Sequence, residues 1–162
     1  MNKNKATVTA NPGESTIRIE RTFDVAPEKF FRVITNKDLI PKWWVGPGYE
    51  VRVDEMDVRE GGRWKFVQVM QDGTEYAFFG VYHEIAPAER VIQTFEFSGL
   101  PERGHVILER MEMQAAEGGK TKITTTQSFF SVQDRDGMLQ SGMEEGMQNT
   151  YRVLDELLAE VE

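Results

Sequence analysis

The sequence contains no cysteine among its 162 residues and only two histidines, His83 and His105. The absence of thiols excludes disulfides, thiolate catalysis and cysteine-ligated metal sites. Each histidine falls in a predicted strand with no second histidine near it in the sequence. We therefore expect surface or structural roles for both histidines, no metal site and no cofactor.

Positive charge and long apolar runs are also scarce. The chain has 19 Lys and Arg against 27 Asp and Glu, a formal net charge of −8. Such an acidic chain lacks the basic surface that nucleic acids and anionic membranes attract. No apolar run is long enough to span a bilayer, and the first residues lack the apolar block of a signal peptide. We expect a cytoplasmic protein with no nucleic-acid or membrane partner.

Sequence motifs of catalysis are missing as well. The chain has no GxSxG, HExxH, Walker loop or dinucleotide fingerprint. Four acidic residues, Asp54, Glu55, Asp57 and Glu60, lie close together but lack the alternation of a calcium loop, which indicates a solvated edge. The motifs therefore predict no catalytic residues.

Alternation of apolar and polar residues dominates the rest of the chain. We expect a disordered leader over 1–14 and a single domain over 15–162. Short alternating segments separated by turn residues predict seven antiparallel strands, at 15–25, 50–58, 63–71, 75–86, 89–98, 104–115 and 120–130. Between the first two strands, apolar residues at helical spacing predict two short helices, at 27–35 and 37–44.

The last 30 residues change to a helical period. Ser131 and Asp134 resemble a capping box, and an apolar stripe follows to the end of the chain. One long amphipathic helix is therefore expected. An α+β fold follows, in which a curved seven-stranded sheet grips this helix on its concave face and the short helices plug one end.

Several features predict a cavity between sheet and helix. Gly142 and Gly146 each cost a helix about 1 kcal/mol relative to Ala, so they must allow either close helix–sheet approach or room for a ligand. Arg21, Gln93, Glu109 and Gln127 share the presumed inner faces with apolar residues, where unpaired polar groups are costly. A solid aromatic core is the alternative. The predicted ligand-binding residues are Trp43, Trp44, Trp64, Phe66, Phe95, Phe97, Glu109, Met111, Gln127, Phe129, Met143, Gly146, Met147 and Tyr151.

Trp43 and Trp44 are neighbours that cannot share one face of a helix, because successive residues point about 100° apart. We expect one ring to pack inward and the other to lie at the cavity mouth, where an amphipathic ring is useful. In the alternative, the leader or a second subunit buries both rings.

Five motifs, in order along the chain, resemble one family. They are RTFDVAP (21–27), WWVGP (43–47), DVREGGRW (57–64), ERVIQTF (89–95) and DGMLQSGMEEG (136–146). Together they are similar to bacterial proteins that share the domain of the activator of Hsp90 ATPase, within the START-like, Bet v 1-like (SRPBCC) superfamily. Glu60 replaces a usual proline, and Met147 replaces a frequent bulky aromatic residue, a change that would widen or soften that end of the pocket.

The resemblance implies a helix-grip fold around an apolar cavity, since superfamily members bind lipids, sterols, plant hormones or polyketide-like molecules. We expect a carrier or sensor of a small apolar ligand. A cyclase- or hydrolase-like enzyme is an alternative, with Glu109 and Arg21 as the acid–base candidates. A co-chaperone-type interaction module is another, but the namesake's activity also depends on sequence outside this domain, so we expect no chaperone partner. A homodimer is compatible with all three.

Overall fold

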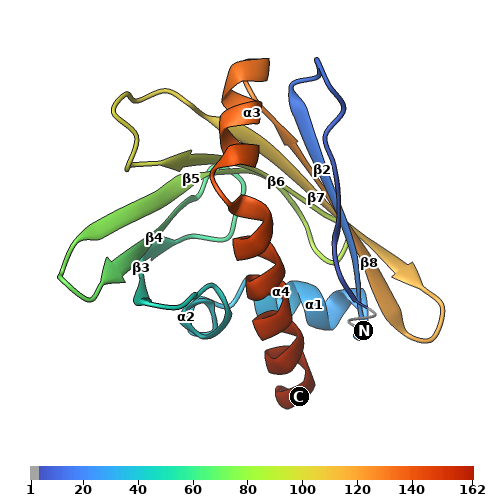
Figure 1. Cartoon of the computed structure of the whole chain (residues 1–162). Helices are drawn as coiled ribbons and strands as arrows, with labels where there is room; N and C mark the ends of the chain where they lie inside the picture. The colour runs from blue at the N-terminus through green and yellow to red at the C-terminus, as the bar shows by residue number, and fades with distance from the viewer. Residues whose placement is uncertain (1–3) are drawn as a thin grey trace.

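A computed structural model of the protein describes residues 4–162. The chain forms one antiparallel sheet with helices on its concave side (Figure 1). Within those residues the strands are β1 (Thr7–Thr9), β2 (Thr16–Phe23), β3 (Tyr49–Met56), β4 (Arg63–Met70), β5 (Glu75–Ala86), β6 (Arg90–Phe97), β7 (Ile107–Ala116) and β8 (Lys120–Ser128). The helices are α1 (Pro27–Ile34), α2 (Ile40–Trp43), α3 (Val132–Gln140) and α4 (Met143–Glu160).

The strand order is β1-β2-β8-β7-β6-β5-β4-β3, so every neighbour from β3 to β8 is also the next strand in the chain. In Figure 1, α4 crosses in front of the sheet, α1 and α2 lie at its lower end, and α3 lies above. The predicted α+β helix-grip fold is confirmed, and strands β2 to β8 correspond to the seven predicted strands. No helix within residues 4–162 combines the length and apolar character needed to cross a bilayer.

The prediction of a disordered leader over 1–14 is wrong for residues 7–9, which add an eighth strand. Val8 pairs with Ile19 at the edge of the sheet. The side-chain amide of Gln148 in α4 makes two hydrogen bonds to the backbone of Ala6. It accepts from the Ala6 N–H at 3.0 Å and donates to the Ala6 carbonyl at 2.9 Å. A strand of three residues is too short to show alternation, so its partners decide its structure. Residues 1–3 of the leader lie outside the described residues.

The prediction of one long C-terminal helix is also wrong, because a break separates α3 from α4. Gly142 adopts a left-handed conformation (φ 84°) just after the end of α3, a position that favours glycine because it has no Cβ. The beginning of the helical region is as predicted, since Ser131 Oγ accepts a hydrogen bond of 3.0 Å from the Asp134 amide. Of these two glycines, Gly142 therefore terminates a helix, whereas Gly146 lies within one.

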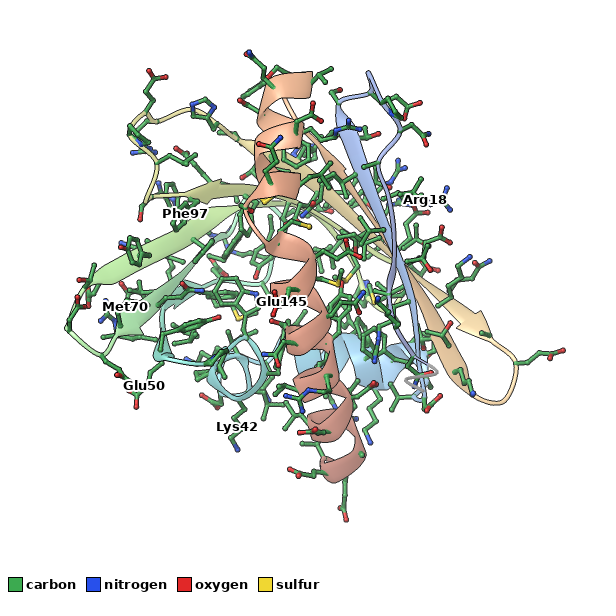
Figure 2. All side chains as sticks on the ribbon, viewed as in Figure 1. Arg18, Lys42, Glu50, Met70, Phe97 and Glu145 are labelled. Carbon is green, nitrogen blue, oxygen red and sulfur yellow. The ribbon has the colours of Figure 1, made fainter. Side chains whose placement is uncertain are left out.

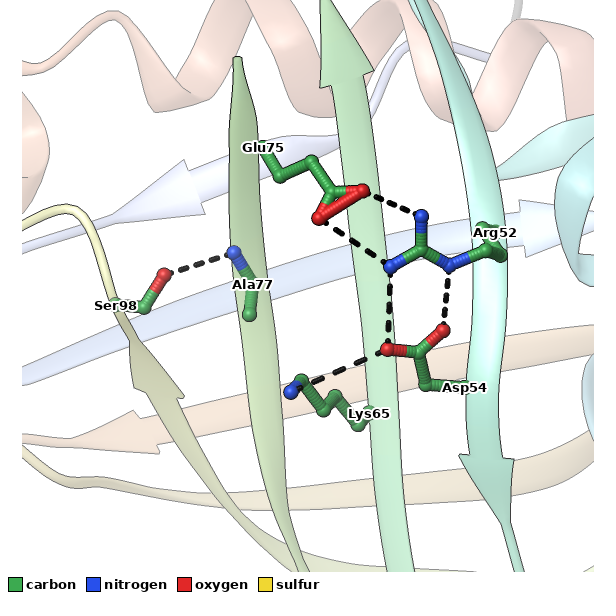
Figure 3. Close-up of polar contacts among 6 residues, drawn as sticks. All are labelled: Arg52, Asp54, Lys65, Glu75, Ala77 and Ser98. Atoms are coloured by element: carbon green, nitrogen blue, oxygen red, sulfur yellow. Dashed lines mark hydrogen bonds and ion pairs between the residues drawn. The ribbon is translucent and has the colours of Figure 1, made fainter. Parts of the chain in front are cut away.

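The two faces of the sheet differ in polarity. The inner face of β2 is buried, whereas the outer face of β3 to β5 carries exposed ion pairs (Figure 3). There, Arg52 lies 2.6 Å from Asp54 and 2.5 Å from Glu75. Exposed pairs of this kind contribute little to stability, because solvent screens them. This arrangement fits the prediction of a solvated acidic edge, and it leaves the inner face as the place for a site.

Candidate functional site

A cavity of about 990 Å³ lies between the sheet and helices α3 and α4. The structure places every predicted site residue in its wall, namely Trp43, Trp44, Trp64, Phe66, Phe95, Phe97, Glu109, Met111, Gln127, Phe129, Met143, Gly146, Met147 and Tyr151. They come from α2 and the residue after it, from strands β4, β6, β7 and β8 with the residue after β8, and from α4. The alternating pattern therefore identified the inner faces of these strands.

The cavity exists because only one half of α4 packs tightly. Leu154, Leu157 and Leu158 are buried in the core near the C-terminal end of the helix. At Gly146, near its N-terminal end, an added Cβ would meet no described atom within 4 Å. Gly146 thus does not serve close approach of helix and sheet. Of the two explanations for this glycine, the structure favours open space.

Aromatic rings form one side of the cavity. Trp64 lies 5.0 Å from Phe66 and 5.7 Å from Phe95, measured between ring centroids. Trp44 stands edge-on to Phe66 and to Phe78, at 5.3 and 5.0 Å. Such tilted arrangements are the favoured ones for aromatic pairs. The rings give the cavity an apolar wall suited to a flat or aliphatic ligand.

The two adjacent tryptophans separate as their positions on the chain require. Trp43 is buried in the core with Ile40 of the same short helix, whereas Trp44 stays half-buried. The leader, as far as residues 4–14 describe it, therefore does not bury both rings, and their burial by a second subunit stays a prediction. Figure 2 shows Lys42, the preceding residue of α2, pointing away from the molecule, as expected for the opposite side of this short helix.

Besides Tyr49, two further aromatic residues of the wall, Phe78 and Tyr82, were missed by the sequence reasoning. The signal that could have found them is strand register. Phe66 pairs with Phe78 across β4 and β5, and Tyr82 pairs with Gln93 across β5 and β6. Once Phe66 faces inward, its cross-strand partner must share that face. Burial raises the pKa of the Tyr82 hydroxyl well above its ordinary value.

A polar row crosses the floor of the cavity. Gln93, Glu109 and Gln127 are cross-strand neighbours on β6, β7 and β8. Both amides donate to the Glu109 carboxylate, Gln93 at 3.3 Å and Gln127 at 2.9 Å. Burial raises the pKa of Glu109, and the two amide donors oppose this effect only in part. Burial and the nearby Glu109 carboxylate also raise the pKa of Tyr151 to about 12.

Arg21, the second acid–base candidate, does not line this cavity. Its guanidinium pairs with Asp155 of α4 and lies 4.3 Å from the ring centroid of Phe23. It lies on the buried face of β2, as predicted, where its Nη1 finds no hydrogen-bond partner within residues 4–162. Glu109 and Arg21 therefore cannot act together on a molecule in the cavity.

The cavity opens beside the loop between β6 and β7, because Leu100 and Glu102 line it and are also exposed. Glu96 anchors this loop by accepting hydrogen bonds from Arg103 Nε at 2.6 Å and from the Gly104 amide at 3.1 Å. At the opening, His105 of the same loop contacts Asp134 of α3. Sequence patterns could not find these residues, because loop positions carry no periodicity.

Comparison with known proteins identifies the family. A family profile described as "Activator of Hsp90 ATPase homolog 1-like protein" matches residues 24–159. The chain belongs to this family. The resemblance drawn from five sequence motifs is thereby confirmed. No curated protein matches the sequence.

Solved structures share the fold. A crystal structure of a protein from Rhodobacter sphaeroides has a TM-score of 0.88 at 22% identity, covering 98% of this chain and 100% of that one. A solution structure of a protein from Arthrobacter aurescens has a TM-score of 0.84 at 19% identity, covering 96% and 92%. The AHSA1 protein from Silicibacter pomeroyi has a TM-score of 0.71 at 25% identity, covering 89% and 97%.

Proposed function

We propose that this protein is a cytoplasmic carrier or sensor that binds a small hydrophobic molecule, of lipid or polyketide-like size, between its sheet and α4. The observation that carries the proposal is the cavity of about 990 Å³ with its aromatic wall. Ligand sites typically have volumes of about 300–1,000 Å³, mostly apolar walls and a few placed polar groups. The binding of apolar molecules by the wider superfamily supports the same reading.

The polar row on the floor gives the cavity a means of orienting a ligand. Glu109 is held by two amides in a wall that is otherwise mainly apolar. A purely structural core gains nothing from a carboxyl group held in this way, because its burial is costly. The row therefore supports a ligand with an apolar body and one polar group.

An NMR titration tests the proposal. The indole N–H signals of Trp43, Trp44 and Trp64 report on the cavity, because all three rings line it. Pools of fatty acids, sterols, flavonoids and long-chain amines are added to ¹⁵N-labelled protein. We expect saturable shifts of indole signals and of α4 amides with at least one pool.

The control is a pair of leucine variants on adjacent residues of α4. Gly146→Leu places a side chain in the cavity, whereas Glu145→Leu adds the same side chain at an exposed position (Figure 2). We expect Gly146→Leu to weaken binding about tenfold or more and Glu145→Leu to leave it within about twofold. If no pool shifts the NMR signals of the folded protein, the result would count against the proposal. Equal affinity of the two variants for a ligand would also count against it.

A further inference from the structure

Acidic groups outnumber basic groups in the walls of the cavity. Three carboxyl groups line it, those of Glu109 on the floor and of Glu102 and Asp134 at the opening. Among the described residues, no Lys or Arg lines it, and His105 is the one basic side chain there. The whole chain is acidic as well, with a net charge of −8. An anionic ligand would enter this cavity against the field of the carboxylates at its opening.

The floor offers hydrogen-bond acceptors that the described residues leave unused. The Gln93 and Gln127 amide groups donate to the two Glu109 oxygens. The Gln127 carbonyl oxygen is buried and finds no hydrogen-bond partner within residues 4–162. Gln127 itself is only 9% exposed. A buried acceptor without a donor is costly, and a ligand group with several N–H donors would satisfy it together with Glu109.

We propose that the ligand of this cavity is an apolar molecule with one basic nitrogen, and that its ammonium group binds Glu109. This inference rests on the proposed function and narrows its ligand class. An ammonium group supplies positive charge and as many as three N–H donors, which match the Glu109 carboxylate and the Gln127 carbonyl. Aromatic rings beside the floor add a second attraction, because ring faces attract cations. Phe95 lies two residues from Gln93 on the same face of β6.

The state of Glu109 explains how an acidic floor is tolerated without a ligand. Burial raises the pKa of Glu109, so the empty cavity favours its neutral form. Binding of the ammonium form of an amine favours the carboxylate instead. The Glu109 proton then leaves to solvent as the ion pair forms, and the net charge in the cavity does not change. Ligand uptake is therefore coupled to proton release at pH values below the raised pKa.

Three matched probes test the inference: naphthylethylamine, naphthylethanol and naphthylacetate. They share an apolar body and differ in carrying an ammonium, a hydroxyl or a carboxylate group. In calorimetric titration of the full chain, we expect the amine to bind about tenfold or more tighter than the alcohol. The carboxylate should bind most weakly. Repeating the amine titration in buffers of different ionisation enthalpy is expected to show proton release.

Two glutamine variants provide the control. Glu109→Gln keeps the shape of the floor but removes its titrating group, whereas Glu145→Gln removes one exposed charge of α4 outside the cavity wall. We expect Glu109→Gln to weaken binding of the amine about tenfold or more and to abolish proton release. Its affinity for the alcohol should change less than about twofold. Glu145→Gln should change the affinity for the amine less than about threefold.

The outcomes separate this inference from the proposed function. Binding of the alcohol or the carboxylate as tightly as the amine would overturn the amine assignment and leave the carrier or sensor role standing. An unchanged amine affinity in Glu109→Gln would do the same. Binding of none of the three probes would remove both the amine assignment and the cavity's role for ligands of this size.

Discussion

His105 and Asp134 join the loop between β6 and β7 to helix α3, with Nδ1 and Oδ2 3.0 Å apart. The contact spans the opening of the cavity, since both residues line it. The hydrogen bond and the charge of Asp134 raise the pKa of His105, and Glu102, 3.7 Å from Nε2, acts in the same direction. Protonation of His105 is thus linked to a contact at the opening of the cavity.

The contact should have a defined pH dependence. A histidine whose pKa is raised by folding contributes stability that is fully present below its ordinary pKa of about 6.5 and is lost as the pH rises through the raised value. We expect Asp134→Asn to lower the pKa of His105 toward about 6.5, measured from the imidazole signals by NMR. Glu102→Gln should lower it less. An unchanged His105 pKa in Asp134→Asn would show that the contact does not form in solution.

Gly142 and Gly146 should respond in opposite directions to alanine. Gly146 is helical and a Cβ there meets no described atom within 4 Å, so Gly146→Ala should stabilise the protein by about 1 kcal/mol. Gly142 has φ 84°, so Gly142→Ala should destabilise it by about 1–2 kcal/mol. Urea unfolding of both variants measures the free energies. Destabilisation by Gly146→Ala would mean that α4 approaches the sheet more closely than the structure shows.

The buried carboxyl of Glu109 should limit stability at high pH. Because its pKa is raised in the folded state, the folded protein holds this proton more strongly than the unfolded chain does. Stability should therefore fall as the pH rises from the ordinary pKa of 4.5 toward the raised value. Glu109→Gln removes the titrating group, so its stability relative to the parent protein should improve over that range. Urea unfolding at several pH values gives the comparison, and a difference independent of pH would contradict it.

Alternation along strands predicted most of this fold, because burial of one face imposes a period of two residues. Ile17, Ile19, Arg21 and Phe23 illustrate this, since all four are buried on β2. The same alternation predicts that Glu109 and Gln127 lie on the inner face. Their hydrogen bond could not be predicted, because cross-strand register depends on where each hairpin turns.

Failures of prediction occurred where partners far along the chain decide the structure. The strand Thr7–Thr9 is held by β2 and lies beside the contact of Ala6 with Gln148 in α4, so its own residues carry little signal. The break at Gly142 was missed because the apolar stripe continues across it. Cavity volume was also beyond prediction, because it depends on how far α4 stands from the sheet.

Gly80 should be intolerant of any side chain. An added Cβ would lie 1.9 Å from the Thr94 carbonyl oxygen and 2.8 Å from Trp64 Nε1. It would also disturb the hydrogen bond of 3.2 Å that Trp64 Nε1 donates to that carbonyl. We expect Gly80→Ala to destabilise the protein by about 1–3 kcal/mol and to shift the Trp64 indole signal. Gly137→Ala is the control, because a Cβ there meets no described atom within 4 Å; equal stability of the two variants would contradict the prediction.

Gln148 should decide whether the N-terminal segment stays on the molecule. Its amide makes two hydrogen bonds to the Ala6 backbone, and such bonds contribute about 0.5–1.5 kcal/mol each. We expect Gln148→Ala to cost about 1–2 kcal/mol and to speed amide exchange at Ala6 and Val8, measured by NMR. Arg152→Ala, which removes an exposed pair with Glu156 on the same helix, should leave that exchange unchanged. If Ala6 stays protected in Gln148→Ala, pairing of β1 with β2 holds the segment by itself, and the contact with α4 follows from it.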